Sequence, residues 1–309
     1  MSARPLPPVR REYEIALDET ASAPAGAVRD AAPHAGGQHA RPLARGARRA
    51  LLGRLRDAGW LRKTAIAIVL IALWEIAARV LDNDLLLPTF GATALAFAQG
   101  IASGELPAKI AVSLSVLLRG YALGVGCAFA LTALAVSTRI GRDLLTMLTA
   151  MFNPLPSIAL LPLALLWFGL GSGSLLFVLV HAVLWPLALN TFAGFQAVPA
   201  TLRMVGRNYG LTGLRHVVAI LIPAALPSIL AGLRVGWAFA WRTLIAAELV
   251  FGASAGGGLG WYIFQNRNEL YTDRVFAGLA AVIVIGLLVE HGVFDVLERV
   301  TVRRWGAQH

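Results

Sequence analysis

The chain has 309 residues, of which 57% are hydrophobic and only 14% are charged, a composition that excludes an ordinary soluble domain and indicates a membrane protein. The single Cys127 excludes an internal disulfide and a cysteine-based metal cluster, and the six histidines form no His-Glu-x-x-His motif. The formal net charge of +10 lies on residues that flank apolar runs. This pattern is typical of membrane proteins and not of a nucleic-acid-binding face, so no nucleic-acid partner is expected.

Residues 1–50 are rich in Ala, Pro, Gly and Arg and show no hydrophobic periodicity. Such a segment cannot bury enough apolar surface to fold, so we expect a disordered cytoplasmic tail. A regulatory or lipid-binding arm is the alternative. A signal peptide is not expected, because the first apolar run begins only at Thr64 and no small-residue cleavage site follows it.

Six apolar segments after the tail each approach the roughly 20 residues that a helix needs to cross hydrocarbon. They are residues 64–81, 110–137, 144–168, 174–195, 224–251 and 275–297. Helices are expected because they satisfy their own backbone hydrogen bonds, and the short alternating strands of a barrel are missing. The predicted fold class is an all-α membrane protein with six spans. The third span contains Pro154, Pro156 and Pro162, each of which should kink it.

The connections between spans predict the orientation in the membrane. Eight basic residues lie in segment 41–63. The other basic connections carry Arg139 and Arg142, then Arg203, Arg207 and Arg215, and finally Arg299, Arg303 and Arg304. With six spans these four segments share one side, while the opposite connections have no basic excess. Both termini are therefore predicted to lie in the cytoplasm.

The connection formed by residues 198–222 has the pattern of two short helices broken at Gly210. Arg203 and Arg207 lie four residues apart, and like charges at this spacing mildly destabilise a helix. No acidic residue between 199 and 219 offsets them, so a group outside the segment should do so. The alternative is that these arginines only fix topology and contact lipid headgroups.

The segment from Gly210 to Pro223 reproduces half of the cytoplasmic loop of permease subunits in binding-protein-dependent ABC importers. Gly210 is followed by nine residues, Ile220, one residue, Ile222 and Pro223. The chain resembles in particular the branch that handles nitrate, aliphatic sulfonates, taurine and bicarbonate. The supporting motifs, in order over residues 60–306, are LWEIAAR, LLLPTFGA, PLPSIALLPLALLWFGLGSG, GLRVGWAFAWRTLIAAEL, GLGWYIFQNRN and LERVTVRRWG. One departure is that the loop's usual Glu-Ala-Ala is replaced by Met204, Val205 and Gly206, which puts an acid-mediated contact with the partner in doubt.

The resemblance implies that residues 51–309 form a type I permease bundle of six helices in the bacterial inner membrane. It also implies ABC ATPase subunits, a periplasmic solute-binding protein and a second permease subunit as partners, with a homodimer as the simpler arrangement. The chain lacks a Gly-x4-Gly-Lys-Ser/Thr motif, so ATP and Mg²⁺ are expected on the ATPase and no cofactor on this chain. The loop residues expected to dock on the ATPase are Arg203, Met204, Val205, Gly206, Arg207, Gly210, Leu214, Arg215 and Pro223. A secondary transporter or channel that works without an ATPase is the alternative.

Ionisable residues within the spans are candidates for function because they are costly in a membrane. Arg242 and Glu248 are candidates for the translocation pathway, where Arg242 would attract an anion; alternatively, Arg242 binds neighbouring carbonyls. Glu248 and Arg234 match residues common in the family that the chain resembles, where a structural pairing between helices is the alternative. His181 has no second ligand at helical spacing, so we expect an interior histidine and no metal site. The segment 252–256 fits Gly-x-Ser-x-Gly but lacks the strand of a nucleophile elbow, so no catalytic residue is expected.

Overall fold

The computed structural model describes residues 59–251 and 257–301, and these form helices without a strand. The chain divides into two compact units, residues 1–61 and 62–309, and the description below concerns the second. The expected tail over residues 1–50 lies outside the described residues. The α-helices are α2 (Gly59–Leu81), α3 (Phe90–Ala102), α4 (Glu105–Ser137), α5 (Arg139–Phe152), α6 (Leu161–Phe168), α7 (Ser172–Ala197), α8 (Ala200–Asn208), α9 (Gly213–His216), α10 (Ile222–Phe251), α11 (Leu259–Asn268), α12 (Thr272–Val289) and α13 (Asp295–Thr301).

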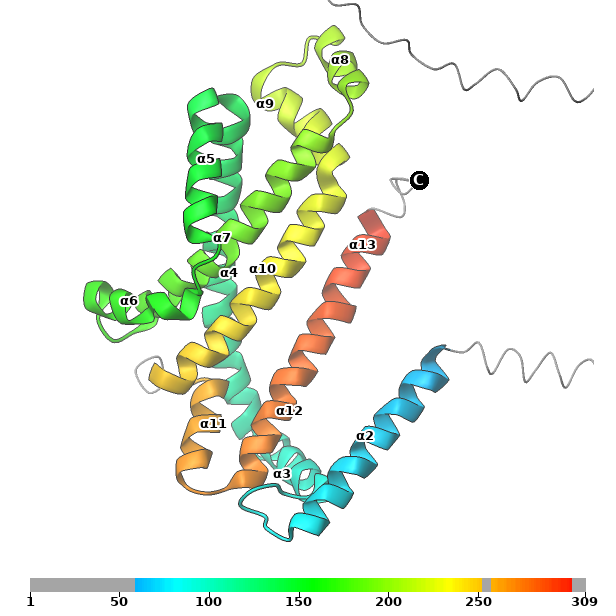
Figure 1. Cartoon of the computed structure of the whole chain (residues 1–309), viewed down its shortest axis with the longest axis vertical. Coiled ribbons are helices and arrows are strands. Elements are labelled where there is room, and N and C mark those ends of the chain that lie inside the picture. The colour runs from blue at the N-terminus through cyan, green and yellow to red at the C-terminus, as the bar shows by residue number, and fades with distance from the viewer. Residues whose placement is uncertain (1–58, 252–256, 302–309) are drawn as a thin grey trace, which may run out of the picture. The chain divides into compact units, whose positions relative to one another are not determined.

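Five of the described helical stretches are long and apolar enough to cross a membrane, and a sixth span results if one bent pair is joined. That pair is α5 with the 3-10 helix η1 (Ser157–Leu160) and α6, bent by 90°. The sequence predicts one kinked span over 144–168. In the structure the helix instead ends at Phe152, and the next helical segment begins at Ser157 and runs in a different direction (Figure 1). Pro154 and Pro156 explain the break, since each lacks the donor that a continuous helix requires.

Several helices extend beyond their predicted spans. The second predicted span starts at residue 110, whereas α4 begins at Glu105 and has 33 residues. The last predicted span becomes α12, a π-helix η4 (Glu290–Phe294) and α13. Two short helices, α3 and α11, lie at the same end of the second unit and were not among the predicted spans (Figure 1). A helix of 10 to 13 residues is too short to cross the membrane, so the hydropathy pattern alone does not predict these two.

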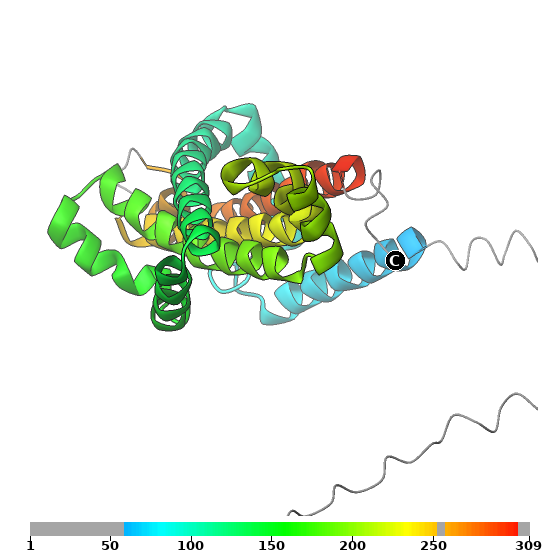
Figure 2. The same ribbon diagram turned by 90° about the horizontal axis from the view of Figure 1, so that it is seen from above.

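The core of the second unit forms where α7 packs along both α4 and α10 (Figures 1 and 2). Glycine permits the close approach: a Cβ on Gly120 would lie 2.6 Å from the Cβ of Leu179, and one on Gly124 would lie 2.7 Å from the Cβ of Val183. Small residues spaced four apart let two helix backbones meet in this way. The close packing of α4 on α7 therefore requires glycine, which has no side chain, at positions 120 and 124.

Helix α2 contacts the rest of the second unit mainly near its C-terminal end. The Trp74 indole N–H donates to the Pro88 carbonyl at 3.0 Å, and the ring packs against Phe90 and Phe276. The Glu75 carboxylate accepts from the Phe90 amide at 2.9 Å. Most of the preceding apolar surface of α2 is exposed, as suits a helix surrounded by lipid or by another subunit.

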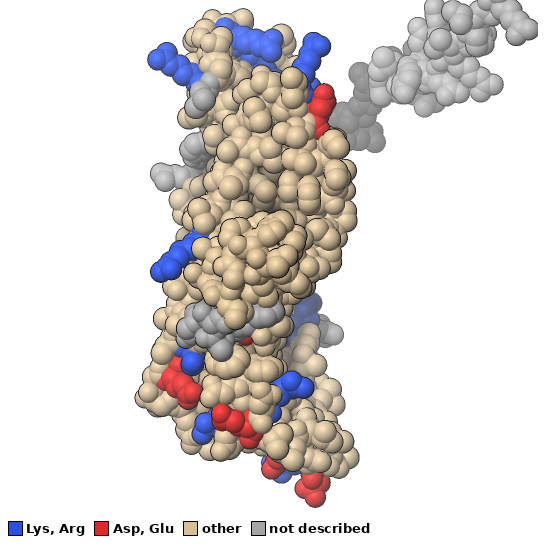
Figure 3. Space-filling view, turned by 90° about the vertical axis from the view of Figure 1, so that its left-hand side faces the viewer, with Lys and Arg blue, Asp and Glu red and all other residues tan. Residues whose placement is uncertain are grey.

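Charge is unevenly distributed along the second unit. Helices α8 and α9, the start of α5 and the end of α13 lie at one end, while α3 and α11 lie at the other (Figure 1). The face in Figure 3 shows Lys and Arg gathered at the first end, and Asp and Glu concentrated toward the second with some basic residues among them. This separation agrees with the predicted topology, in which the basic end faces the cytoplasm. The sidedness itself remains a prediction.

The tight contact between α4 and α7 predicts a strong dependence on one glycine. We expect Gly124→Ala to lower the free energy of unfolding by roughly 1–3 kcal/mol, because the new methyl group overlaps Val183 and the backbone near it. Thermal unfolding of the purified protein measures this change. The matched control is Gly126→Ala in the same helix, where a Cβ meets no atom within 4 Å. Equal melting temperatures for the two variants would contradict this packing.

Candidate functional site

The connection between α7 and α10 folds as α8, a turn, α9 and a short π-helix η2 (Val217–Leu221). The break expected at Gly210 is present, with φ of +72°, a conformation that glycine adopts without strain. The amide of Gly210 donates to the Arg207 carbonyl at 2.9 Å, and the amide of Leu211 donates to the Gly206 carbonyl at 3.0 Å. These bonds close the end of α8 and fix the direction in which the chain returns.

Arg203 and Arg207 have different surroundings in this loop. The Arg203 guanidinium donates to the carbonyl oxygens of Phe195 and Gln196 at the end of α7. These carbonyls lie at the negative end of the α7 dipole and outside the loop helices, so they are the groups that compensate the charge of Arg203. The Arg207 side chain is exposed and makes no side-chain hydrogen bond or ion pair with the described residues. Of these two residues, Arg207 is therefore the one available to a partner.

An apolar patch surrounds Arg207 on the exposed side of α8. Met204 is 54% exposed, Val205 47% and Tyr209 81%. Gly206 lies on the buried side, where a Cβ would come within 2.9 Å of the His216 ring, so α8 packs closely on the returning segment. We call Met204, Val205, Arg207 and Tyr209 the α8 patch.

The remaining predicted loop residues lie outside this patch. Arg215 is exposed and lines an apolar groove with Leu211 and Val218. Pro223 stands in the first turn of α10, a position that tolerates its missing amide. Leu214 belongs to α9, but its side chain lies outside the described part of the structure. Only a subset of the predicted loop residues thus forms one continuous surface.

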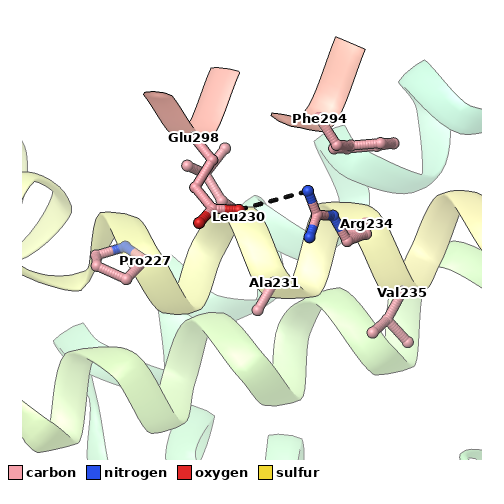
Figure 4. Close-up of a pocket in the computed structure, with 7 residues that line it drawn as sticks. All are labelled: Pro227, Leu230, Ala231, Arg234, Val235, Phe294 and Glu298. Atoms are coloured by element: carbon pink, nitrogen blue, oxygen red, sulfur yellow. Dashed lines mark ion pairs between the residues drawn. The ribbon is translucent and has the colours of Figure 1, made fainter. Parts of the chain in front are cut away.

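Arg234 binds acidic residues near the end of the chain. Its guanidinium lies 2.8 Å from Asp295 Oδ1, 3.2 Å from Glu290 Oε1 and 3.5 Å from Glu298 Oε2. The side chain also lies over the Phe294 ring, 5.8 Å from its centroid (Figure 4). These contacts join α10 to η4 and α13, which agrees with the expected pairing between helices. A cavity of about 310 Å³ lies beside the cluster, which Figure 4 shows with Glu298 pointing toward Arg234.

Glu248 lies at a different junction, where α4, α10 and α11 meet. The residue is only 1% exposed, and its carboxylate accepts from Ser113 Oγ at 2.8 Å and from the Gly260 amide at 2.9 Å. Ser113 Oγ in turn accepts from the Leu259 amide at 2.8 Å. The two amides are free N–H groups of the first turn of α11, so Glu248 and Ser113 cap that helix together. This junction fits the alternative of a structural role between helices, and the place of Glu248 in the pathway stays a prediction.

Arg242 faces an open pocket of about 410 Å³. The pocket is lined by residues 153–158 of the broken span, by His181 and Trp185 of α7, and by Phe239 and Arg242 of α10. Arg242 is exposed, its Nε donates to the Ala238 carbonyl at 3.0 Å, and its guanidinium lies over the Phe239 ring at 4.9 Å. Arg242 thus binds a neighbouring carbonyl and borders an open pocket, while its place in the translocation pathway stays a prediction.

His181, which the sequence predicts as an interior histidine, lies in the lining of this pocket. Its Nδ1 lies 3.1 Å from Ser157 Oγ, and Ser157 follows the break in the third span. The pairing joins residues 24 positions apart, so helical spacing alone could not reveal it. The signal available in the sequence is the proline-rich break, because irregular backbone at membrane depth is tolerated where it lines a cavity.

Within the described residues no group of three or more His, Cys, Asp or Glu side chains could hold a metal. The Gly-x-Ser-x-Gly segment at 252–256 lies outside these residues. The features that the structure brings together are thus a basic helical loop at one end and an open pocket beside a broken span.

These features define a class of protein: a helical, multi-pass membrane subunit with a projecting loop and an open, cationic pocket. The chain belongs to the family of binding-protein-dependent transport system inner membrane components, whose model matches residues 120–301. The match includes both the loop and the pocket. It confirms the resemblance inferred from the sequence motifs, so the chain is an ABC importer permease of the inner membrane.

Three relatives show how far the similarity extends. The chain is 31% identical over 254 residues to SsuC of Escherichia coli K12, named for transport of aliphatic sulfonates, covering 81% of this chain and 95% of SsuC. It is 30% identical over 247 residues to the taurine transport system permease protein TauC of the same organism, covering 76% and 86%. It is 31% identical over 194 residues to the nitrate import permease protein NrtB of a Synechocystis species, covering 63% and 70%.

The junction at Glu248 yields a stability prediction. We expect Glu248→Leu to lower the free energy of unfolding by roughly 1–3 kcal/mol for each buried donor left without a partner. Thermal unfolding in detergent measures the loss. The control is Glu269→Leu, because Glu269 is exposed and bonds only Gln265 within its own helix. If both variants unfold at the wild-type temperature, the carboxylate does not hold the junction.

Proposed function

We propose that this chain forms one half of the import pathway for a small anionic solute, and that a separate ATPase drives it through the loop at residues 198–222. The observation that carries the proposal is the open pocket beside the broken span, which holds Arg242 at its edge. Taurine, aliphatic sulfonates and nitrate, for which the relatives are named, all carry an oxyanion. A guanidinium binds oxyanions well because its planar N–H groups match their geometry.

The proposed contact with the ATPase is the α8 patch. Exposed apolar side chains surrounding one arginine are typical of protein interfaces, where aromatic residues, Met and Arg are enriched. Met204 stands where the family's loop usually has Glu, so the contact here relies on apolar burial and on Arg207. ATP and Mg²⁺ belong on the partner in this proposal, and this chain binds no cofactor of its own.

A second permease subunit would enclose the pathway, since the pocket in this chain is open. A homodimer is the simplest arrangement. The basic end would face the cytoplasm and the ATPase, with both termini on that side. The end with α3 and α11 would then face the periplasm and receive the solute-binding protein.

If the ATPase docks on the α8 patch, reversing the charge of Arg207 should prevent assembly with the ATPase without affecting folding. We expect Arg207→Glu to abolish copurification of the ATPase while leaving membrane insertion unchanged, since Arg207 has no internal partner among the described residues. A pulldown from membranes expressing the complete transport system measures this effect. Arg267→Glu is the matched control, because Arg267 is also exposed but lies on α11 at the opposite end.

The result for Arg207→Glu must differ from that for Arg203→Glu. Arg203 binds the end of α7, so its replacement should also destabilise the protein. Undiminished recovery of ATPase with Arg207→Glu would contradict the docking proposal. If the wild-type permease transports solute at full rate without an ATPase, the chain is instead a secondary transporter or channel.

Arg242 provides a test of the pathway. We expect Arg242→Leu to reduce uptake of taurine, methanesulfonate or nitrate, whichever the system carries, by roughly tenfold or more, because a charge-assisted contact is lost. ATPase copurification should be unchanged. Radiolabelled uptake in whole cells and a pulldown from the same cells measure the two quantities. An equal loss of uptake and assembly would show that Arg242 is needed only for structure.

A further inference from the structure

Two residues that line the pocket each carry a buried nitrogen without a hydrogen-bond partner among the described residues. Trp185 is only 7% exposed, yet its indole Nε1 has no hydrogen-bond partner among the described residues. The Nε2 atom of His181 is buried and likewise has no partner there. A buried donor without an acceptor costs roughly 1–3 kcal/mol, and such groups are rare in folded proteins. A ligand that accepts hydrogen bonds would remove this cost.

The surrounding contacts hold both groups in place. Phe152 stacks on the Trp185 ring at 5.4 Å with an interplanar angle of 11°, and His181 meets Trp185 edge-on at 6.0 Å. Ser157 Oγ lies 3.1 Å from His181 Nδ1. When the serine hydroxyl donates to Nδ1, the ring proton resides on Nε2, which then becomes a donor. Ser157 thereby fixes Nε2 of His181 as the donor.

His181 and Arg242 lie on α7 and α10, two helices that pack along each other (Figure 1). A Cβ on Gly236 of α10 would lie 3.7 Å from the Cα of Val183 in α7, so residue 238 lies opposite residue 181. Arg242 stands one turn further along α10, but its Nε donates back to the Ala238 carbonyl at 3.0 Å. The guanidinium is thereby held toward the level of His181, and both side chains line the same pocket.

The residues that line the pocket favour a ligand with a particular charge and with an apolar part. Among its described lining residues, Arg242 is the one with a permanent charge, and none is Asp or Glu. The rest of the lining is largely apolar and includes Pro154, Leu155 and Pro186. A cationic donor set with no carboxylate favours an anion, and the apolar remainder favours an organic body attached to it.

We propose that this pocket is the solute site of the permease and binds an organic oxyanion, a sulfonate or a carboxylate with an apolar body. Arg242, His181 Nε2 and Trp185 Nε1 donate to the oxygens, and Ser157 positions His181. The inference rests on the proposed function and adds the contacting residues and the class of solute. It assigns to His181 and Trp185 a role in binding that the sequence motifs do not indicate.

The test measures binding to the full chain in lipid nanodiscs by titration calorimetry, with benzenesulfonate as the probe. We expect measurable binding of benzenesulfonate, none of benzylammonium, and weaker binding of nitrate. Trp185→Phe and His181→Phe should each weaken benzenesulfonate binding by about tenfold or more, the loss expected for one charge-assisted hydrogen bond. Trp241→Phe is the matched control, because Trp241 is also buried but donates to Val282 away from the pocket.

Ser157→Ala removes one hydroxyl and supplies a second variant if the aromatic substitutions impair folding. Nitrogen NMR of the His181 ring, assigned by its loss in His181→Phe, should report the Nε2–H tautomer in the wild type. In Ser157→Ala the two tautomers should mix and the affinity should fall. An unchanged ring spectrum would overturn the positioning role, which no purely structural effect on stability could mimic.

Three results would overturn the site: wild-type affinity in both Trp185→Phe and His181→Phe, equal binding of benzylammonium, or nitrate binding as tight as that of benzenesulfonate. The same preparations are assayed for ATPase capture. Capture without pocket-dependent binding rejects the site and leaves the proposed function intact. Failure of the wild-type chain to capture an ATPase rejects the proposed function itself.

Discussion

Irregular backbone in a membrane is stable only where other protein groups or a water-filled cavity satisfy its polar atoms. The break between α5 and η1 places residues 153–156 under this constraint. The structure meets it by placing the break against α7 and α10, at the edge of an open pocket. The prolines therefore do more than kink a span, because the broken segment lines one part of the pocket, which a straight helix would not do. Arg242, His181 and Trp185 line the same pocket as this broken segment.

Helix α10 connects the pocket to both ends of the second unit. It begins directly after η2, passes the Arg234 cluster and Arg242, and ends at the Glu248 junction. Arg234 binds three carboxylates toward one end, while Glu248 binds backbone and hydroxyl donors near the other. A helix held at two points and packed along α7 moves as a rigid body more readily than it bends. Displacement of the loop would then move Arg242, which lies midway between the contacts of Arg234 and those of Glu248.

The sequence predicts those parts of this fold that depend on local pattern. Apolar length identifies the spans, and Gly210 marks the break in the loop because its positive φ is a local requirement. The sequence does not predict contacts between residues far apart in the chain. Ser113 and Glu248 are 135 positions apart, and Arg234 and Asp295 are 61 apart. Neither pair follows from helical spacing, so a pathway role for Glu248 was as reasonable from sequence as its capping role.

The same limit applies to the loop. Sequence alone treats Arg203 and Arg207 as equivalent, since both lie on one face of one short helix with no acid nearby. Their difference arises because Arg203 reaches the carbonyls at the end of α7, which a one-dimensional pattern cannot show. Once Arg203 is committed to α7, the exposed side of α8 carries one free arginine within an apolar surface. A partner that binds this surface gains most from burying Met204, Val205 and Tyr209, and salt should weaken such a contact less than one built on ion pairs. Replacement of the usual glutamate by Met204 is consistent with that balance, because it exchanges a solvated charge for apolar area at the tip of the loop.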